Sequence, residues 1–226
     1  GMGEDAKEAV PAIAKALQDD SDAVREAAVT ALASLGANAV VAVPKLVGLL
    51  GDPDPKVRKR AISALGKIGP VGAPALCDAL RIPSDAVRPP VMALLKTMGE
   101  AAVPALIDAL TDSDTVARQF VANTLGSMNS VAKGAAPALV EGLNDADAGV
   151  RNAIVEALRR IGPDAVPALI PAVAADDVLT RGNAVLALGR LGPGAKPAAF
   201  ALGMALKDPD TGVRKSAAVA IGQLRQ

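Results

Sequence analysis

Carboxylate pairs are the residues of this sequence whose type and spacing could most directly do chemistry. Asp52 and Asp54 stand two residues apart, as do Asp145 and Asp147, and carboxylate oxygens are preferred ligands of divalent cations. Similar pairs recur at regular intervals along the chain, which favours a structural role over a single metal site. We therefore expect no metal ion and no cofactor.

Other catalytic systems lack the side chains that they need. The 226 residues contain no His, which excludes a Ser-His-Asp or Cys-His nucleophile and any His-containing metal site. Cys77, in the apolar stretch PALCDAL, is expected to be a small buried hydrophobe. The Gly-rich segments GPVG and GPGAK follow no strand, so they do not predict a phosphate loop. We expect no catalytic residue and a protein that is not an enzyme.

Charge and composition narrow the class further. Lys plus Arg equals Asp plus Glu, 24 each, so the usual electrostatic basis for binding nucleic acid or an anionic membrane is missing. No run of about 20 apolar residues indicates a membrane span. One cysteine and the absence of a signal-peptide core fit a cytoplasmic protein. An apolar content of 51% with only two Phe predicts many thin, similar layers of small aliphatic side chains.

A recurring arginine defines how the chain is organised. The stretch DPDPKVRKRAISALGKIG at residues 52–69 returns in related form along the whole sequence, with successive arginines 33, 30, 30, 33, 30 and 33 residues apart. A nearly constant period of this kind is typical of a stacked repeat array. The seven arginines are Arg25, Arg58, Arg88, Arg118, Arg151, Arg181 and Arg214.

Each repeat is predicted to hold two helices. A proline stands fourteen residues before six of the arginines and opens an apolar helix A, as in PALIDAL, and the arginine opens helix B. In the seventh repeat this anchor position is Phe200. Where the link between repeats is three residues longer, we expect helix A to start one turn earlier. The repeats span residues 3–36, 37–69, 70–99, 100–129, 130–162, 163–192 and 193–226, in one domain over residues 1–226.

Capping residues support these boundaries. Four residues before each arginine stands a good N-cap for helix B: Ser21, Asp54, Ser84, Asp114, Asp147, Asp177 and Asp210. Eleven residues after the arginine stands a residue suited to closing the helix in the left-handed conformation: Gly36, Gly69, Gly99, Asn129, Gly162 and Gly192.

This pattern resembles the HEAT repeat family, especially the short bacterial type also seen in phycobilin-lyase-like proteins. The resemblance rests on the helix-A proline, the Asp of the turn and the Val-Arg that opens helix B, and it covers nearly the whole chain. It implies an all-α solenoid, a right-handed superhelix of seven two-helix repeats. It also implies that the B helices line a concave face.

The resemblance further implies a ladder in which turn aspartates and helix-B arginines join successive repeats. The physical case is independent, because turn carboxylates gathered at one edge repel each other and a planar guanidinium can engage two acceptors at once. Contact with a ligand remains the alternative role for these arginines. The predicted ladder comprises Asp19, Arg25, Asp52, Arg58, Arg88, Asp112, Arg118, Asp145, Arg151, Arg181, Asp208 and Arg214.

The outward positions of helix B are the candidates for binding a partner. Phe120 is there either as an exposed anchor or as a side chain half-covered by the next layer. Lys59, Arg60 and Lys67 form either a basic cluster for a ligand or a plain solvated surface. Pro89 and Pro90 should delay or kink their helix. The candidates are Lys59, Arg60, Ser63, Lys67, Pro89, Pro90, Gln119, Phe120, Asn123, Ser127, Asn152, Glu156, Arg160, Asn183, Leu186 and Arg190.

These observations favour a non-enzymatic scaffold that holds a protein or peptide segment, expected to be acidic, in the concave groove. One alternative is an enzyme-associated subunit of the phycobilin-lyase-like kind. A weaker alternative is a nucleic-acid-binding groove, against which the lack of Trp and Tyr for base stacking argues. End-to-end self-association or further repeats in a longer chain are also compatible with the sequence.

Overall fold

The computed structural model describes the backbone of residues 2–225 and the side chains of residues 8–225. Within this part the chain forms α-helices joined by short 3₁₀ segments, with no strand. The A helices are α1 (Met2–Ala16), α3 (Val43–Gly48), α5 (Ala73–Ala79), α7 (Val103–Ala109), α9 (Ala136–Glu141), α11 (Val166–Ala172) and α13 (Ala199–Ala205). The B helices are α2 (Asp22–Leu35), α4 (Pro55–Ile68), α6 (Arg88–Thr97), α8 (Thr115–Ser127), α10 (Ala148–Ile161), α12 (Val178–Leu191) and α14 (Thr211–Gln223).

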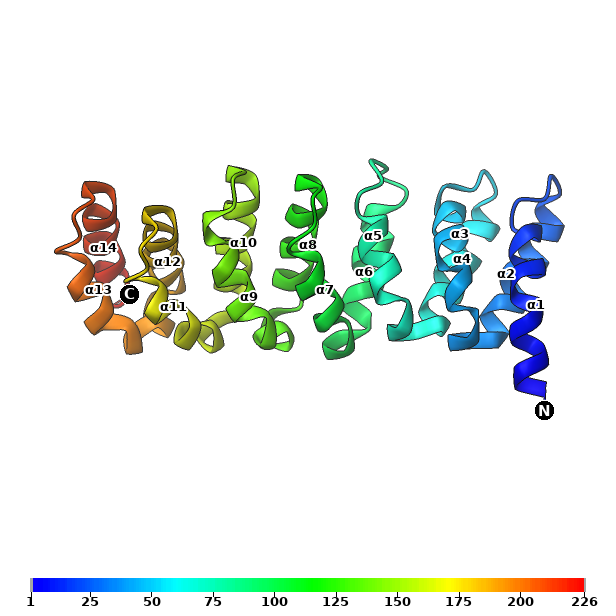
Figure 1. Ribbon diagram of the computed structural model, residues 1–226, viewed down its shortest axis with the longest axis horizontal. Helices are drawn as coiled ribbons and strands as arrows, with labels where there is room; N and C mark the ends of the chain where they lie inside the picture. Colours follow the sequence, from blue (N-terminus) through cyan, green and yellow to red (C-terminus); the bar gives the residue numbers. More distant parts are fainter. Residues whose placement is uncertain (1, 226) are drawn as a thin grey trace. The chain divides into compact units, whose positions relative to one another are not determined.

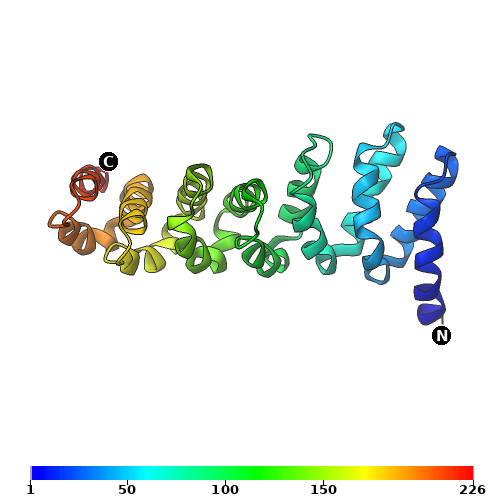
Figure 2. The same cartoon turned by 45° about the horizontal axis from the view of Figure 1, so that its top comes forward.

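The chain forms two compact units, residues 1–109 with α1–α7 and residues 110–226 with α8–α14. Inside each unit, successive helix pairs lie side by side, as Figures 1 and 2 show. The A helices pack on neighbouring A helices, as α3 does on α5, and the B helices on neighbouring B helices, as α2 does on α4. Stacked helix pairs make each unit an all-α solenoid, as predicted. The prediction of one domain over residues 1–226 stays a prediction.

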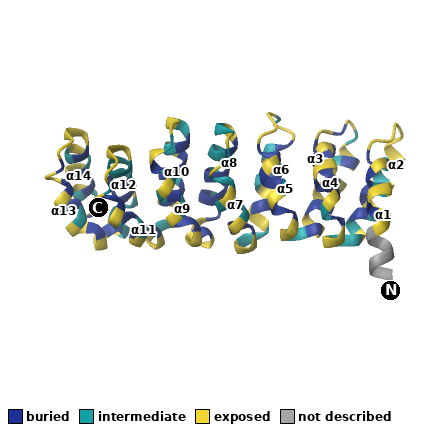
Figure 3. Ribbon diagram, in the orientation of Figure 1, coloured by how far each residue is buried: buried dark blue, intermediate teal, exposed yellow. Residues whose placement is uncertain are grey.

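Leucines at equivalent positions form the core between the layers. The third residue of the proline-anchored stretch and the seventh residue after the arginine both point into this core, which Figure 3 shows as buried bands along the inner sides of the helices. Burying a leucine stabilises the fold by about 1.5–3 kcal/mol, so the repeated pair holds each layer. These leucines are at most 1% exposed: Leu46, Leu76, Leu106, Leu139, Leu169 and Leu202 on the A helices, and Leu32, Leu65, Leu95, Leu125, Leu158 and Leu188 on the B helices.

The predicted closing residues all have a positive φ angle. The φ angle is +51° at Gly36, +88° at Gly162 and +53° at Asn129, and Asn129 is the only non-glycine residue with positive φ in the described part of the chain. Asparagine tolerates this conformation better than other residues with a side chain. The predicted ends of the B helices are therefore confirmed.

The longer links between repeats form longer 3₁₀ segments, and the prediction that helix A starts a turn earlier is wrong. Each of α3, α5, α7, α9, α11 and α13 starts one residue before its anchor position, whatever the length of the link. The extra residues instead extend η1 (Gly36–Ala42), η5 (Asn129–Ala135) and η8 (Gly192–Ala198), whereas η3 (Gly69–Gly72), η4 (Gly99–Ala102) and η7 (Gly162–Ala165) are short. Two further 3₁₀ turns, η2 (Leu49–Gly51) and η6 (Gly142–Asn144), extend α3 and α9.

Small residues explain why the long links are 3₁₀ helices. Residues i and i+3 lie on the same side of a 3₁₀ helix, which has three residues per turn. In η1 this pair is Ala39 and Ala42, and in η5 it is Ala132 and Ala135, all 0% exposed. Two alanines in this spacing let the segment lie flat against its neighbours.

The start of helix B follows the predicted caps in five of the seven repeats. The side chains of Asp54, Asp114, Asp147, Asp177 and Asp210 each accept a hydrogen bond from a backbone N–H of the first turn. Ser21 makes no such bond, so its predicted cap is wrong. Ser84 accepts from the N–H of Ala86, but inside a turn that precedes the helix.

The proline pair delays its helix, as predicted. Helix α6 begins only at Arg88, with Pro89 and Pro90 in its first turn, whereas the other B helices begin three residues before their arginine. Proline suits the first turn because the backbone N–H groups there have no partner within the helix.

One stretch, Asp22–Gly51, is long and apolar enough by length and composition to cross a membrane, with a window of mean hydropathy 1.7. It comprises α2, η1, α3 and η2, and its backbone turns sharply at Gly36, where φ is +51°. Its leucines and valines, including Val29, Leu32 and Leu46, form part of the core described above. The core therefore accounts for part of this stretch, since 33% of the window is buried.

Candidate protein-interaction surface

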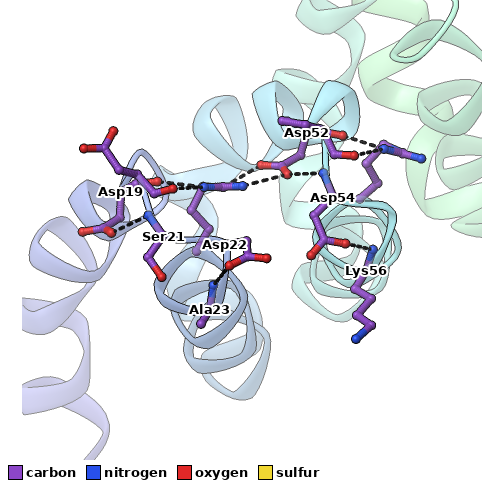
Figure 4. A network of polar contacts seen from close by, with 11 residues as sticks. Asp19, Ser21, Asp22, Ala23, Asp52, Asp54 and Lys56 are labelled. Atoms are coloured by element: carbon purple, nitrogen blue, oxygen red, sulfur yellow. Dashed lines mark hydrogen bonds and ion pairs between the residues drawn. The ribbon is translucent and has the colours of Figure 1, made fainter.

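Three pairs of the predicted ladder, Arg25–Asp52, Arg118–Asp145 and Arg181–Asp208, form as bidentate ion pairs. Nε and Nη2 of an arginine donate to the two carboxylate oxygens of an aspartate 27 residues later, in a bidentate pair that we call a rung. Nη1 of the same arginine donates to two carbonyl oxygens of its own turn, for Arg25 those of Asp19 and Asp20 (Figure 4). The Nε to Oδ2 distances are 2.8 Å for Arg25–Asp52, 2.7 Å for Arg118–Asp145 and 2.7 Å for Arg181–Asp208.

Two arginines of the ladder make no rung. Nη1 of Arg58 donates to the carbonyls of Asp52 and Pro53, and Nη1 of Arg151 donates to those of Asp145 and Ala146. Each rung aspartate stands six residues before the next arginine of the ladder, and the equivalent positions before Arg88 and Arg181 hold Ile82 and Ala175. These side chains have no carboxylate, so the ladder is interrupted there.

The remaining arginines also bind backbone carbonyls, Arg88 through Nε and Nη2 and Arg214 through Nη1. Nε of Arg88 donates to the carbonyl oxygen of Leu80, 3.0 Å away, and Nη1 of Arg214 donates to that of Asp208, 2.7 Å away. Asp19 and Asp112 lie at the equivalent turn position, where their carboxylates accept from the N–H groups of Ser21 and Asp114. Each turn is therefore tied to its own helix B by the arginine.

The rungs keep their aspartates ionised. The hydrogen bond from the paired arginine is the largest cause that lowers the pKa of Asp52, Asp145 and Asp208, against the opposing effect of burial. Asp52 is 6% exposed, and Asp208 is 9% exposed. A carboxylate buried to this extent is tolerated because it is paired and hydrogen-bonded.

The B-helix face of residues 1–109 is less basic than its sequence suggests. Lys59, Ser63 and Lys67 on α4 are exposed, as predicted. Arg60, however, pairs with Glu26 of the preceding B helix, Nη2 to Oε1 2.6 Å, and so is partly neutralised. The two side chains border a shallow groove of about 580 Å³ between α2 and α4.

On the B-helix face of residues 110–226, some of the residues predicted to bind a partner are exposed and others are half-buried. Asn152, Arg160 and Arg190 are exposed. Asn183 donates to the carbonyl oxygen of Leu143, 2.7 Å away, and thus ties helix B to the preceding repeat. The half-buried ones are Gln119, Phe120, Asn123, Ser127, Glu156, Asn183 and Leu186.

Glu156 is the acidic residue predicted on this face, and two arginines neutralise it. Arg159 makes two hydrogen bonds to its carboxylate, and Nε of Arg160 makes a third of 2.9 Å. The bond from Arg159 is the largest cause that lowers the pKa of Glu156, to about 2. The net charge of this cluster is positive.

A groove of about 430 Å³ lies between α12 and α14 on the same face. Its walls combine apolar side chains, Leu186 and the 55% exposed Val219, with two exposed cations, Arg190 and Lys215. The two helices approach closely because Gly189 lacks a Cβ, which would lie 3.2 Å from Cα of Ala220. The prediction did not single out Val219 or Lys215, although they occupy the same outward positions.

The exposed aromatic residue is not the expected one. Phe120 is half-buried, so the alternative of a side chain partly covered by its surroundings holds. Phe200 is 82% exposed and, with the 54% exposed Met204, borders a groove of about 650 Å³ between α11 and α13. The sequence alone contains a sign that Phe200 is exposed, because it occupies the anchor position that holds a proline in the other six repeats. Those prolines are all exposed.

Cys77 is buried, 4% exposed, as predicted. Burial is the main cause that raises the pKa of its thiol to about 12, so at neutral pH the reactive thiolate is scarce. Within the described residues, no three His, Cys, Asp or Glu side chains gather as a metal site.

The stacked helix pairs and the exposed faces of their B helices define this protein as an α-solenoid of the repeat-protein class. Family models described as HEAT repeats match residues 41–95, 73–159 and 136–222, and a HEAT repeat model matches residues 9–39. The chain belongs to the HEAT repeat family.

Solved structures and curated proteins add little to this assignment. An engineered protein from a structural genomics consortium is similar at 22% identity and a TM-score of 0.38, covering 96% of each chain. Human deoxyhypusine hydroxylase in complex with glycerol is similar at 25% identity and a TM-score of 0.45, covering 96% of this chain and 84% of that one. Neither likeness carries an argument at these TM-scores. No curated protein matches the chain.

Proposed function

We propose that this chain is a non-enzymatic scaffold that binds an acidic, amphipathic segment of a partner protein along its B helices. HEAT repeats generally mediate interactions between proteins. The observation that carries the proposal is the groove between α12 and α14, where Leu186 and Val219 form an apolar wall beside Arg190 and Lys215. Apolar surface supplies affinity for a partner, and the cations select the charge of the segment that binds.

The charge of the groove supports an acidic partner. Neither Arg190 nor Lys215 forms an ion pair with any residue in the described part of the chain. Glu156, at the position equivalent to Val219, is already neutralised by Arg159 and Arg160. The groove therefore offers positive charge to a ligand, although the whole chain has a formal net charge of zero.

The exposed lysines of α4 support the same kind of partner in residues 1–109. Lys59 and Lys67 are exposed on the B-helix face, while Arg60 is held by Glu26. We expect these lysines to contribute less than the α12–α14 groove, because exposed charges in water add little affinity.

The state of Cys77 supports a function without catalysis. Its thiol is buried and protonated at neutral pH, so it is poorly suited to carry a covalent intermediate or an attached chromophore. With no His in the chain, a general base would have to be one of the carboxylates, and the rung aspartates already pair with arginines.

Selection of peptides on the immobilised chain tests the proposal. A random peptide display library should yield acidic peptides with interspersed apolar residues, and calorimetry should show that they bind the chain. Charge reversal in the Arg190→Glu/Lys215→Glu variant should weaken binding at least about tenfold, the loss expected for two cations at an interface. Lys133→Glu/Lys196→Glu makes the same charge change on exposed positions of η5 and η8 and should leave binding unchanged. Selection of basic peptides, or equal binding by both variants, would contradict the proposal.

A further inference from the structure

Arg151 holds its guanidinium in the pose of a rung, with no carboxylate in front of it. Its Nη1 donates to the carbonyl oxygens of Asp145 and Ala146, 2.6 Å and 3.0 Å away. No acceptor among the described residues bonds its Nε or Nη2. Every buried side-chain nitrogen or oxygen in the described part of the chain has a hydrogen-bond partner, so these two nitrogens are reached by solvent.

The rungs of the same unit show which group this edge accepts. Nε and Nη2 of Arg118 donate to Asp145 at 2.7 Å and 2.9 Å, and those of Arg181 donate to Asp208 at 2.7 Å and 3.2 Å. In both rungs Nη1 is fixed on two carbonyl oxygens of the turn, as it is in Arg151. This unit thus uses this arginine pose twice to bind a carboxylate.

The turn opposite Arg151 offers one more donor. In the rungs, the carboxylate also accepts from the N–H two residues later, as Asp208 does from Asp210 at 2.8 Å. The equivalent N–H belongs to Asp177, and because Ala175 has no carboxylate, this N–H donates to no described side chain. Asp177 is exposed, so a ligand can reach its backbone.

We propose that Arg151, together with the backbone N–H of Asp177, is a binding site for a carboxylate group presented by a partner protein. The ligand group must stay at van der Waals distance, about 3.5–4.0 Å, from Cβ of Ala175, so it approaches from the solvent side onto Nε and Nη2. Charge-assisted bidentate hydrogen bonds make this edge selective for a planar carboxylate.

Neighbouring acidic side chains do not prevent this binding. Asp176 and Asp177 lie in the same turn as Ala175, but the side chain of Asp177 is engaged at the start of α12 by Thr180. The rungs tolerate the same arrangement, because Asp147 and Asp210 cap helices two residues after the rung carboxylates of Asp145 and Asp208.

Arg58 has the same free edge but a poorer site. In the repeat register, the rung position for Arg58 holds Ile82, which is 40% exposed, whereas the rung position for Arg151 holds the smaller Ala175. The N–H of Ser84, which corresponds to that of Asp177, donates to the carbonyl oxygen of Ile82 at 2.8 Å. Arg151 is therefore the site that the structure favours.

Site-specific NMR of the arginine side chains tests this proposal without reference to the B-helix groove. The Nε–H correlations of the full chain are followed near pH 6 during titration with sodium acetate and with the blocked tripeptide Gly-Asp-Gly. Sodium chloride and the blocked Gly-Asn-Gly are the controls for ionic strength and for the peptide. The correlation of Arg151 should shift saturably with both carboxylates, while those of Arg118 and Arg181 stay in place.

A matched pair of variants completes the test. Ala175→Asp supplies the carboxylate from within the chain and should weaken the response of Arg151 roughly tenfold or more, as expected for competition with a charge-assisted pair. Ala175→Asn has nearly the same size and should retain most of the response. Tighter binding of Gly-Asp-Gly than of acetate indicates a protein side chain as the source, and equal binding indicates any free carboxylate. A stationary Arg151 signal, or an equal response in Ala175→Asp, would overturn the proposal.

Discussion

Nε of Arg181 lies 2.7 Å from Oδ2 of Asp208, an aspartate that stands 27 residues later in the chain. The same offset joins Arg25 to Asp52 and Arg118 to Asp145. Each of these three rungs joins layers whose arginines are 33 residues apart and whose link is a long 3₁₀ segment. In these pairs of layers the rung and the long link together fix the register.

Removing the charge of a rung should destabilise the protein. We expect Asp52→Asn to lower the free energy of unfolding by about 1–3 kcal/mol, because Arg25 loses a charged acceptor in a nearly buried position. Urea denaturation followed by circular dichroism measures this change. Asp85→Asn, at an exposed position, is the matched control and should change stability by less than about 0.5 kcal/mol. Equal effects of the two substitutions would contradict a stabilising ladder.

Restoring an interrupted rung should stabilise the protein. We expect Ala175→Asp to raise the free energy of unfolding by about 1 kcal/mol, because the new carboxylate can accept from Nε and Nη2 of Arg151. The hydrogen bonds of Nη1 already hold this guanidinium in place. Ala175→Asn, which cannot supply the negative charge, should gain less. Thermal melts of both variants against the parent chain measure the difference. A lower melting temperature for Ala175→Asp than for Ala175→Asn would contradict the expected rung.

Acid should weaken the fold through the same carboxylates. Hydrogen bonds from arginine lower the pKa of Asp52, Asp145 and Asp208 below 3.8, and that of Glu156 from 4.5 to about 2. Because these pKa values are lower in the folded state, their stabilisation is full above the unfolded values and is lost as pH falls through the folded ones.

Stability should therefore decline as the pH falls from about 4.5 towards 2, the interval that the pKa of Glu156 spans. Urea midpoints between pH 7 and pH 2 measure this decline. It should be shallower in the Asp145→Asn/Asp208→Asn variant, which lacks two of the groups. The same slope in both proteins would show that the rungs do not contribute.

Glycine at one position of helix B is required in one repeat and replaceable in another. A Cβ added at Gly126 would lie 2.9 Å from Cα of Ala157, whereas one at Gly222, the equivalent residue of α14, would meet nothing within 4 Å. We expect Gly126→Ala to destabilise the protein by about 1–3 kcal/mol through this overlap. Gly222→Ala should be neutral or stabilising by about 0.5–1 kcal/mol, because alanine favours helix. Urea denaturation of the two variants decides the point, and destabilisation of similar size in both would contradict close packing of α8 on α10.

The fold was largely predictable because each repeat carries its own signals. The closing residues, such as Asn129 with φ of +53°, and the late start of α6 before Pro89 follow from local backbone chemistry. The 3₁₀ links were not predicted, because period alone cannot distinguish one more α-helical turn from a longer 3₁₀ segment. The buried pair Ala39 and Ala42 shows, once the structure is known, which of the two the chain adopts.

The candidate surface was less predictable, because it depends on contacts between repeats. Arg60 was expected to be part of a basic cluster, but its charge is shared with Glu26 from the layer before. Glu156 was expected on an open face, but its carboxylate is neutralised by Arg159 and Arg160. Phe200 stands at the anchor position, which the repeat pattern marks only as the start of helix A. A pattern within one repeat does not reveal which neighbours cover or neutralise its side chains.

A charge-swap experiment at the α12–α14 groove tests the central claim most directly. Calorimetry measures how an acidic peptide selected on the chain, and the same peptide with its acids replaced by lysine, bind the parent chain and the Arg190→Glu/Lys215→Glu variant. We expect the acidic peptide to bind the parent at least about tenfold more tightly than the variant, and the lysine peptide to recover binding to the variant. Binding of the acidic peptide to both proteins with equal affinity would contradict the claim.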